Sequence, residues 1–281
     1  MRTEQKIAIL GGDTRQLFAA EVLRQKGFSV ALYGFAETES FRLPASAETP
    51  EEALRDADAV LLPLPYRKGD VLNMPFSPVP MRVDDLIRIL PDGIPVFAGK
   101  ADDRLPAGVM DYNAEEAFQI RNAVPSAEGA IRVAMEQMDR TLCGAVCLVV
   151  GAGRIGRHLA VLLRAFGAEV FLSSRKEEDL AKTEALGLHA IRTDAIAGIV
   201  GQADVVFNTV PAPVVTREVV GNMRKQTPII DLASGAGGAD AEAAAEAGIR
   251  VVHALGLPGK FTPRSAGEAV ADTVCRLFEN L

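Results

Sequence analysis

The sequence is poor in cysteine, and this shortage excludes two classes of small stabilised domain. Its 281 residues include only Cys143, Cys147 and Cys275, which are too few for a disulfide scaffold. The first two are separated by three residues and the third is distant, a spacing that does not match a zinc site. We therefore expect reduced thiols that fill space inside a cytoplasmic protein.

Histidine is equally scarce. His158 falls in an expected helix and His189 near an expected strand, and we interpret both as structural. His253 leaves two interpretations open, a core histidine with satisfied hydrogen bonds or a side chain that reaches the substrate. The sequence holds no pattern of metal ligands, and we expect no metal.

Long apolar runs are also lacking. No run is long enough to span a bilayer, and the N-terminus, MRTEQKIAIL, has too short an apolar part for a signal peptide. Hydrophobic residues make up 48% of the chain and charged residues 24%, a composition typical of globular proteins. The formal net charge is −7 and basic residues are scattered, which argues against nucleic acid as a partner. We expect a cytoplasmic protein that binds neither a membrane nor nucleic acid.

What the sequence does contain is an alternation of strands and helices in two rounds. In the first round we expect strands at KIAIL, FSVALYGF, ADAVLLPLP and IPVFAGK, and helices after GG, at TPEE and at RVDDLIRIL. TPEE, residues 49–52, has the form of a capping box with proline at the first helical position. The second round has strands at CLVV, GAEVFLSS, ADVVFNTVP, TPIIDLAS and IRVVHALG. The pattern predicts an α/β protein of two Rossmann-like, doubly wound domains with parallel sheets and a cleft between them.

The segment between the two rounds predicts a helix over SAEGAIRVAMEQMDRT, with Ser126 placed to cap it. We therefore divide the chain into an N-terminal, substrate-side domain, an inter-domain helix, a dinucleotide-binding domain and a C-terminal helix that returns toward the N-terminal domain. Their respective residues are 1–122, 123–142, 143–263 and 264–281. Domains joined in this way are expected to hinge.

A glycine pattern, G-x-G-x-x-G, follows the strand CLVV and opens the next helix. Gly151 permits the tight turn, Gly153 lets the backbone approach a pyrophosphate, and Gly156 lets helix and strand pack closely. Backbone N–H groups and the helix dipole then face the phosphates. We assign to this dinucleotide site the residues Gly151, Ala152, Gly153, Arg154, Ile155 and Gly156.

The end of the next strand indicates which cofactor binds. NAD sites usually place an acid there to accept hydrogen bonds from the ribose 2′-hydroxyl, but this chain has Ser173, Ser174 and Arg175. Two hydroxyls and a guanidinium suit a 2′-phosphate, which a carboxylate would repel. Glu177 and Glu178 are expected to begin the next helix. The sequence therefore predicts NADP.

Later strand ends should complete the site, because ligands of open α/β sheets lie beyond the carboxyl ends of the strands. From FNTVPAP and DLASGAGG we assign Thr209, Pro211, Ser234 and Gly235 to cofactor binding. ALGLPGK is expected to be a loop whose glycines and proline fix a backbone path that ends on Lys260. A surface turn with a solvated lysine is the other open interpretation.

Several segments together resemble one family. AILGGDTRQ, VLLPLP, VFAGK, NAVPSAEGAI, VVGAGRIG, FNTVPAPV and HALGLPGKFTPRSAGE are similar to the A subunit of dipicolinate synthase from spore-forming bacteria, over residues 5 to about 275. The resemblance implies a sporulation enzyme on a branch of the lysine pathway. It implies NADP-linked formation of dipicolinate, pyridine-2,6-dicarboxylate, from 4-hydroxy-tetrahydrodipicolinate or its dehydrated dihydro form. It also implies the flavoprotein-like B subunit of dipicolinate synthase as partner, and we expect an oligomer.

A substrate with two carboxylates needs cations or clusters of N–H groups. Arg15 follows GGD, Lys100 ends FAGK, and Lys260 and Arg264 come from the later part of the chain. Ser126 and Glu128 would begin the inter-domain helix, whose N-terminus would itself attract an anion. Glu128 either relays a proton or only complements the helix dipole. Our candidates for catalysis are Lys100, Ser126, Glu128 and Lys260.

Two alternatives to this function remain open from the sequence. The chain could be a dehydrogenase of the same architecture that acts on another small carboxylate. It could also be a nucleotide-binding regulatory subunit that performs no chemistry itself.

Overall fold

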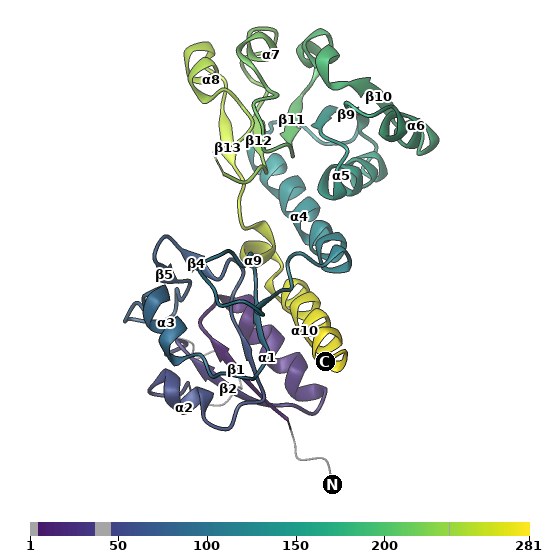
Figure 1. Ribbon diagram of the computed structural model, residues 1–281. Helices are drawn as coiled ribbons and strands as arrows, with labels where there is room; N and C mark the ends of the chain where they lie inside the picture. Colours follow the sequence, from purple (N-terminus) through teal and green to yellow (C-terminus); the bar gives the residue numbers. More distant parts are fainter. Residues whose placement is uncertain (1–4, 37–45, 236) are drawn as a thin grey trace. The chain divides into compact units, whose positions relative to one another are not determined.

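The chain forms two compact units. The computed structural model describes residues 5–36, 46–235 and 237–281. Unit 1 consists of residues 1–122 together with 262–281, and unit 2 consists of residues 123–261. Each unit contains one large parallel sheet with helices packed on it (Figure 1).

The sheet of unit 1 has five parallel strands in the order β2-β1-β3-β6-β7. The chain adds β2 on one side of β1 and then adds β3, β6 and β7 on the other side. The carboxyl ends of β1 and β3 therefore form a topological switch point. A two-stranded antiparallel hairpin, β4–β5, follows β3. Sequence patterns did not predict β4, β5 or β7, because two residues are too few to show a period. The bounds are β1 Lys6–Leu10, β2 Ser29–Tyr33, β3 Ala59–Leu61, β4 Arg67–Lys68, β5 Val71–Leu72, β6 Val96–Ala98 and β7 Met110–Asp111.

The helices of unit 1 begin largely where the sequence places them. They are α1 Thr14–Gln25, α2 Pro50–Leu54, α3 Val83–Ile89 and α10 Pro263–Glu279. At α2 the Thr49 hydroxyl accepts a hydrogen bond from the Glu52 N–H at 3.2 Å, as a capping box requires. The Glu52 carboxylate, however, accepts from the N–H of Glu48 at 2.8 Å rather than from that of Thr49. The expected box is thus only half formed.

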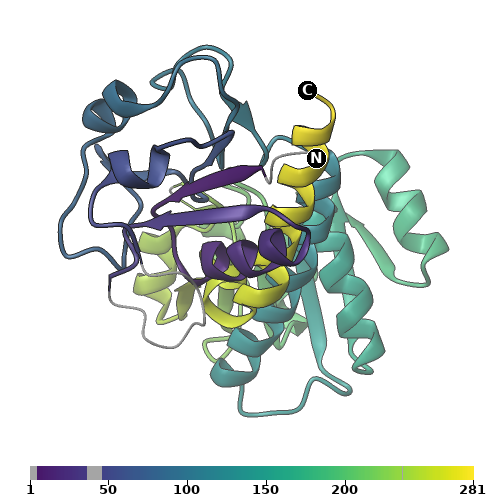
Figure 2. The ribbon, with the colours of Figure 1, turned by 90° about the horizontal axis from the view of Figure 1, so that it is seen from below.

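The C-terminal helix α10 completes the core of unit 1. It lies alongside α1 (Figures 1 and 2), and its buried side chains share one hydrophobic cluster with those of α1 and β1. The two helices approach most closely at Gly267, where a Cβ atom would lie 2.4 Å from the carbonyl oxygen of Arg15 and 2.7 Å from Cβ of Phe18. Only glycine fits this contact.

The sheet of unit 2 has six parallel strands in the order β10-β9-β8-β11-β12-β13. This is the 3-2-1-4-5-6 order of the Rossmann fold, with its switch point between β8 and β11. β10, an exposed edge strand, was not predicted as a separate strand. The bounds are β8 Val146–Val150, β9 Glu169–Ser174, β10 His189–Arg192, β11 Val205–Asn208, β12 Ile229–Asp231 and β13 Val251–His253.

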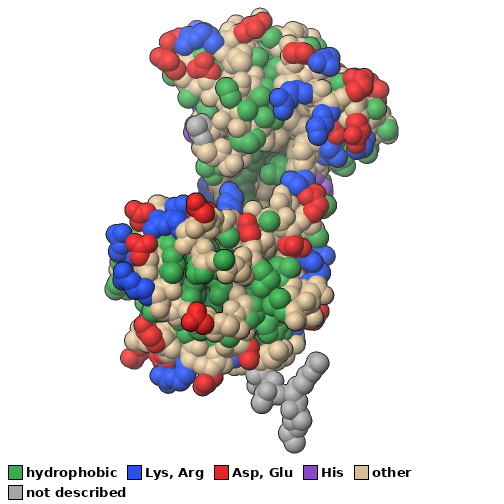
Figure 3. Space-filling view, viewed as in Figure 1, with side chains coloured by type: hydrophobic (Ala, Val, Ile, Leu, Met, Phe, Trp, Pro, Cys, Tyr) green, Lys and Arg blue, Asp and Glu red, His purple; other side chains and the backbone are tan. Residues whose placement is uncertain are grey.

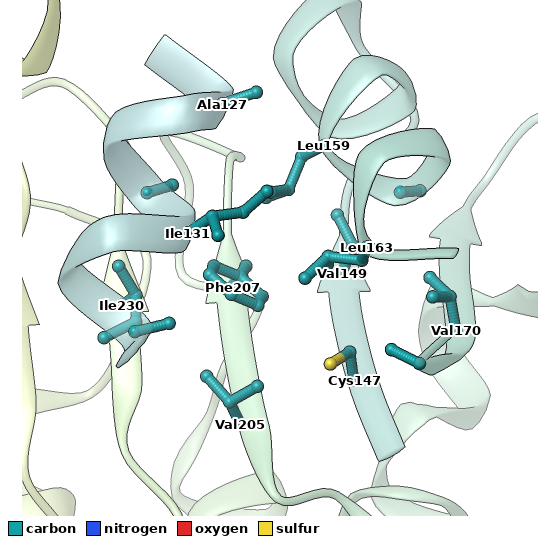
Figure 4. Close-up of a cluster of buried hydrophobic side chains, with 14 of the residues drawn as sticks. Ala127, Ile131, Cys147, Val149, Leu159, Leu163, Val170, Val205, Phe207 and Ile230 are labelled. Atoms are coloured by element: carbon teal, nitrogen blue, oxygen red, sulfur yellow. The ribbon is translucent and has the colours of Figure 1, made fainter. Parts of the chain in front are cut away.

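Helices cover both faces of this sheet. Figure 4 shows Ile131 of α4 and Leu159 and Leu163 of α5 beside Phe207 of β11 in one of the buried clusters of unit 2. The segment expected as the loop GLPGK is instead a short helix, α9, so the prediction of a loop there is wrong. The bounds are α5 Arg154–Ala165, α6 Glu177–Ala185, α7 Arg217–Gly221, α8 Ala241–Ala247 and α9 Leu257–Phe261, with 3₁₀ turns at Thr193–Gly198 and Val200–Gln202.

One helix, α4, includes residues of both units and corrects another expectation. It runs from Glu116 to Gln137, so Ser126 does not cap it and Glu128 is not in its first turn. Pro125 lies inside it and is buried. Proline usually marks a helix boundary because it lacks an N–H and crowds the preceding turn. Here a row of buried small residues packs into the core of unit 2 and holds the helix together through the proline; it includes Ala127, Ala130 and Ala134.

The surface carries charges of both signs. On the face shown in Figure 3, basic and acidic side chains are interspersed over both units. No helix in the described parts of the chain is long and apolar enough to cross a membrane. Among the same residues, no cluster of three or more His, Cys, Asp or Glu side chains has the arrangement needed to hold a metal ion.

The contact at Gly267 generates a prediction. Gly267→Ala should destabilise unit 1 by about 1–3 kcal/mol, because its Cβ would overlap backbone atoms of α1. This would occur although alanine favours a helix by about 1 kcal/mol over glycine. The chain has no tryptophan, and its tyrosines, Tyr33, Tyr66 and Tyr112, all lie in unit 1. Tyrosine fluorescence during urea unfolding therefore measures this unit.

The matched control is Ser265→Ala, at an exposed position of α10 in the same unit, where alanine favours the helix slightly. That variant should unfold at the same urea concentration as the wild type or a slightly higher one. Equal stability of Gly267→Ala and wild type would contradict the close packing of α10 on α1.

Candidate functional site

The glycine turn between β8 and α5 has the geometry that the sequence predicts. Gly151 has a φ of +99°, and a Cβ there would lie 2.5 Å from Cγ2 of Val210 and 2.7 Å from Oγ1 of Thr209. At Gly156 a Cβ would lie 1.8 Å from the carbonyl oxygen of Gly151, so helix α5 can approach β8 only with glycine at this position. At Gly153 a Cβ would meet no atom within 4 Å.

Side chains from the neighbouring strands hold this turn in place. The N–H of Gly151 lies 3.2 Å from the carbonyl oxygen of Ser173 and 3.3 Å from its Oγ, and can donate to both. The Thr209 hydroxyl donates to the carbonyl of Val150 at 2.9 Å, and its N–H bonds the same oxygen at 3.0 Å. Ser173 and Thr209 therefore brace the turn from β9 and from the loop after β11.

The start of α5 fits a dinucleotide phosphate. Gly153 is the N-cap and has no side chain to accept from the first N–H groups of the helix. These donors lack partners within any helix, and the helix dipole adds a partial positive charge. Gly153 and Arg154 are exposed, Ile155 is partly buried and Ala152 is buried. The turn therefore combines an uncapped helix start with a rigid base, which suits a pyrophosphate.

The end of β9 presents cations rather than acids. Arg175 and Lys176 are exposed, and Arg175 has no ion-pair partner among the described residues. Ser174 is buried, and its hydroxyl donates to Asp179 at 3.3 Å and accepts the N–H of Lys176 at 3.1 Å. Asp179 in turn accepts from the guanidinium of Arg157 at 2.8 Å. The nearby carboxylate is thus already neutralised, while the guanidinium of Arg175 faces solvent.

The loops after β11 and β12 are tied together by a buried carboxylate. Asp231 accepts hydrogen bonds from the Asn208 amide at 2.9 Å, from the N–H of Ala233 at 3.0 Å and from the N–H of Gly238 at 3.0 Å. This anchor was not predicted from the sequence, because an aspartate at a strand end has several possible roles. It fixes the loop that exposes Ser234 and Gly235, while Pro211 is exposed on the preceding loop.

The catalytic candidates divide between the units. Lys100 is in unit 1, whereas Ser126, Glu128 and Lys260 are in unit 2. Ser126 is buried in the middle of α4, so it does not mark an anion-binding helix terminus. Glu128 is exposed on the same helix. His253 is also exposed, which rules out the interpretation of a buried core histidine.

Lys260 and a second cation share one aromatic ring. The Lys260 ammonium lies 5.0 Å from the ring centroid of Phe261, and the guanidinium of Arg132 lies 4.3 Å from it. α9 packs closely on α4 at Gly129, where a Cβ would lie 2.8 Å from Cβ of Leu257. Sequence reasoning missed Arg132, whose position follows only from the packing of α9 on α4.

Lys100 has an unusual backbone conformation. Its φ is +58°, a left-handed conformation that few residues other than glycine adopt. The Asp111 carboxylate holds it there by accepting the N–H of Lys100 at 3.0 Å, together with the N–H of Asn113 at 2.8 Å. The side chain is exposed. Such strain is often retained where the side chain has a function.

The glycine turn of unit 1 differs from that of unit 2. After Gly11 and Gly12, Asp13 caps α1 by accepting the N–H of Arg15 at 3.0 Å, and Gln16 accepts the N–H of Asp13 at 3.1 Å. The position that a phosphate would occupy is thus already filled by a carboxylate. This turn does not fit a dinucleotide phosphate, so of the two glycine turns that of unit 2 is the candidate cofactor site.

Comparison with known proteins agrees with this division. Residues 6–116 match the family model of the N-terminal domain of the dipicolinate synthase A subunit. Residues 116–246 match the NAD-binding domain of D-isomer-specific 2-hydroxyacid dehydrogenases. The second match includes the glycine turn, and it supports a nicotinamide cofactor and an oxidoreductase-type subunit without distinguishing NAD from NADP.

Solved structures of more distant dehydrogenases share the fold alone. A transhydrogenase from Sinorhizobium meliloti aligns over 98% of this chain and 93% of its own, with a TM-score of 0.71 and 18% identity. This supports the prediction of two Rossmann-like domains with parallel sheets.

Nearer relatives share both fold and sequence. The dipicolinate synthase A subunit from Bacillus subtilis (strain 168) is 31% identical over 100% of this chain and 98% of its own. The crystal structure of the corresponding A subunit from Bacillus halodurans is also 31% identical, covers 99% of this chain and 98% of its own, and has a TM-score of 0.88. The chain therefore belongs to the family of dipicolinate synthase A subunits.

Proposed function

We propose that this chain is an NADP-dependent oxidoreductase subunit that forms dipicolinate from 4-hydroxy-tetrahydrodipicolinate or its dehydrated dihydro form. The observation that carries the proposal is the full-length similarity to a relative named as the A subunit of dipicolinate synthase. The open glycine turn of unit 2 supports it, because that turn has the shape needed for a dinucleotide pyrophosphate.

NADP, rather than NAD, is favoured by the charges at the end of β9. Arg175 is exposed and without an ion-pair partner among the described residues, and Lys176 is exposed beside it. The hydroxyls of Ser173 and Ser174 are hydrogen-bonded inside unit 2, so we assign to them the shaping of the turn and of the strand end. We assign the 2′-phosphate contact to Arg175, which can donate two hydrogen bonds to it.

The reaction needs little chemistry from the protein. Conversion of the dihydro compound to the pyridine removes one hydride and one proton, and the hydroxylated form must also lose water. When bound, NADP⁺ supplies the hydride acceptor. The remaining tasks are to orient the substrate and to accept a proton. We propose the exposed Glu128 as the group that takes up this proton, with Ser126 fixing the part of α4 that carries it.

Cations should hold the two carboxylates of the substrate. We propose Lys100 and Lys260, because each is exposed and each lies beyond the carboxyl end of a strand. Lys100 comes shortly after β6, and Lys260 is in α9, the helix that follows β13. The left-handed backbone at Lys100 supports a functional role for that residue. Thr209, Pro211, Ser234 and Gly235 are proposed to line the cofactor on the β11 and β12 side.

The relatives are named as one subunit of a synthase, which suggests that a second subunit takes part. We propose that this chain acts with a flavoprotein-like B subunit, in an oligomer in the cytoplasm. The B subunit either stabilises the active conformation or completes the active site.

Turnover provides the direct test. Purified chain, with and without the B subunit, is mixed with NADP⁺ and 4-hydroxy-tetrahydrodipicolinate, and NADPH and pyridine absorbance are recorded. Equal amounts of NADPH and dipicolinate are expected, because each pyridine ring formed releases one hydride. NADPH formed only from other small acids would contradict the proposed substrate. NADP binding without turnover, even with the B subunit, would favour a regulatory role.

Cofactor preference has its own test. Arg175→Glu should weaken NADP⁺ binding about tenfold or more, since a charge-assisted phosphate contact contributes roughly 1.5–3 kcal/mol. NAD⁺ binding should change little, because NAD⁺ carries no 2′-phosphate. Titration calorimetry with both cofactors measures this. Arg250→Ala, an exposed arginine at the opposite edge of the same sheet, is the control. Equal affinity of wild type for both cofactors would refute the assignment.

The proposed lysines make a third prediction. Lys100→Ala and Lys260→Ala should each raise KM for the dicarboxylate roughly tenfold, because each removes one charged contact. NADP⁺ affinity should stay within about twofold, since neither lysine is assigned to the cofactor. Lys26→Ala and Lys225→Ala, exposed lysines of units 1 and 2, serve as controls. A parallel loss of NADP⁺ affinity would place the lysine in the cofactor site instead.

A further inference from the structure

A buried guanidinium lies at the switch point of the sheet of unit 1. Arg15 stands in the first turn of α1, directly after β1, and its side chain crosses to the segment that follows β3. Open parallel sheets bind ligands at this position, beyond the carboxyl ends of the two strands where the order reverses. Unit 1 has no free phosphate site there, because Asp13 fills the glycine turn.

The guanidinium of Arg15 is held rigidly on two sides. Nε and Nη2 donate to the Asp13 carboxylate at 2.9 Å and 2.8 Å, and Nη2 also donates to the carbonyl of Leu64. Burial alone would raise the pKa of Asp13, but the hydrogen bonds and charge of Arg15 outweigh burial and lower that pKa. Asp13 therefore stays ionised and keeps Arg15 fixed at neutral pH.

One nitrogen of Arg15 is left over. Nη1 forms no hydrogen bond with the described residues and is not among the fully buried atoms that lack a partner, although the arginine as a whole is only 7% exposed. This edge of an otherwise buried guanidinium therefore reaches the surface, where its donors can pair with a ligand or with water. An immobile guanidinium with one open donor edge is suited to receive a carboxylate.

Lys100 directly follows a residue that contacts the same segment. The preceding residue, Gly99, donates its N–H to the carbonyl of Pro63 at 3.0 Å and accepts the N–H of Tyr66 at 2.9 Å. A Cβ at Gly99 would lie 2.6 Å from Cβ of Leu64, the residue whose carbonyl binds Arg15. Arg15 thus binds Leu64 directly, and Lys100 is next in sequence to the residue that packs on Leu64. Each is fixed by an aspartate, Asp13 and Asp111 respectively.

We infer that Arg15 and Lys100 form a dicarboxylate-binding subsite contained within unit 1, in which Arg15 binds one carboxylate through its open donor edge and Lys100 binds the other. This inference rests on the proposed function for the substrate class, and it adds Arg15 as a residue that determines specificity. Lys260, which belongs to unit 2, is not part of this subsite. A subsite of this kind selects a dicarboxylate over a monocarboxylate, because the second cation gains a contact only with the former.

The test compares two probes on the full chain with NADP⁺ present. Titration calorimetry measures binding of pyridine-2,6-dicarboxylate and of pyridine-2-carboxylate. Wild type should prefer the dicarboxylate. Arg15→Lys and Lys100→Met should each lose about tenfold in dicarboxylate affinity and lose less for the monocarboxylate, so the preference falls. A purely structural loss would lower both affinities alike.

Controls separate folding from recognition. Arg88→Lys and Lys26→Met change exposed, ion-paired residues of the same unit and should keep the preference of wild type. If Arg15→Lys unfolds by tyrosine fluorescence, the neutral pair Asp13→Asn with Arg15→Gln replaces it, since it leaves no unpaired buried charge. That double variant should lose the preference too.

Two results would overturn the inference in different ways. An unchanged preference in folded Arg15 and Lys100 variants, or an equal loss for both probes, would refute the subsite while leaving the proposed function intact. Failure of wild type to bind the dicarboxylate at all, despite binding NADP⁺, would refute both.

Discussion

Both units depend on the same constraint, which is that the carboxyl ends of all strands in a parallel sheet lie on the same side of the sheet. The sheet therefore brings together residues that are far apart in sequence, such as Gly151, Ser173, Thr209 and Asp231. Specific contacts between their segments are not needed for this. The hydrogen bonds from Gly151 to Ser173 and from Thr209 to Val150 only adjust an arrangement that the sheet already imposes. Specificity is then a matter of which side chains stand at the strand ends.

The two glycine turns show how one architecture is given two uses. In unit 2 the N-cap is Gly153, which has no side chain, so no capping acceptor covers the start of α5, where a phosphate would bind. In unit 1 the N-cap is Asp13, whose carboxylate occupies that place and also orients Arg15. A single aspartate thus takes the place that a phosphate has in other glycine turns and supports the Arg15 guanidinium instead.

Much of this could be predicted from the sequence, and the failures have physical causes. Strands such as KIAIL and CLVV, and the turn at Gly151 to Gly156, depend on local pattern and were predicted correctly. The start of α4 was not, because packing of its alanines into the core of unit 2 outweighs the local effect of Pro125. The helix α9 was missed because glycine and proline favour turns when contacts with α4 are unknown. The fixed guanidinium of Arg15 depends on Leu64, a partner 49 residues away.

The position of α10 has a consequence for biosynthesis. Unit 2 is one uninterrupted stretch, residues 123–261, whereas unit 1 needs residues 262–281 to fill its core. The ribosome delivers the chain from its N-terminus at about 5–20 residues per second, and domains generally fold as units. The first 122 residues therefore wait, with the α10-facing side of α1 uncovered, until the last helix emerges. Unit 2 can therefore finish folding before unit 1, although unit 1 contains the residues that are synthesised first.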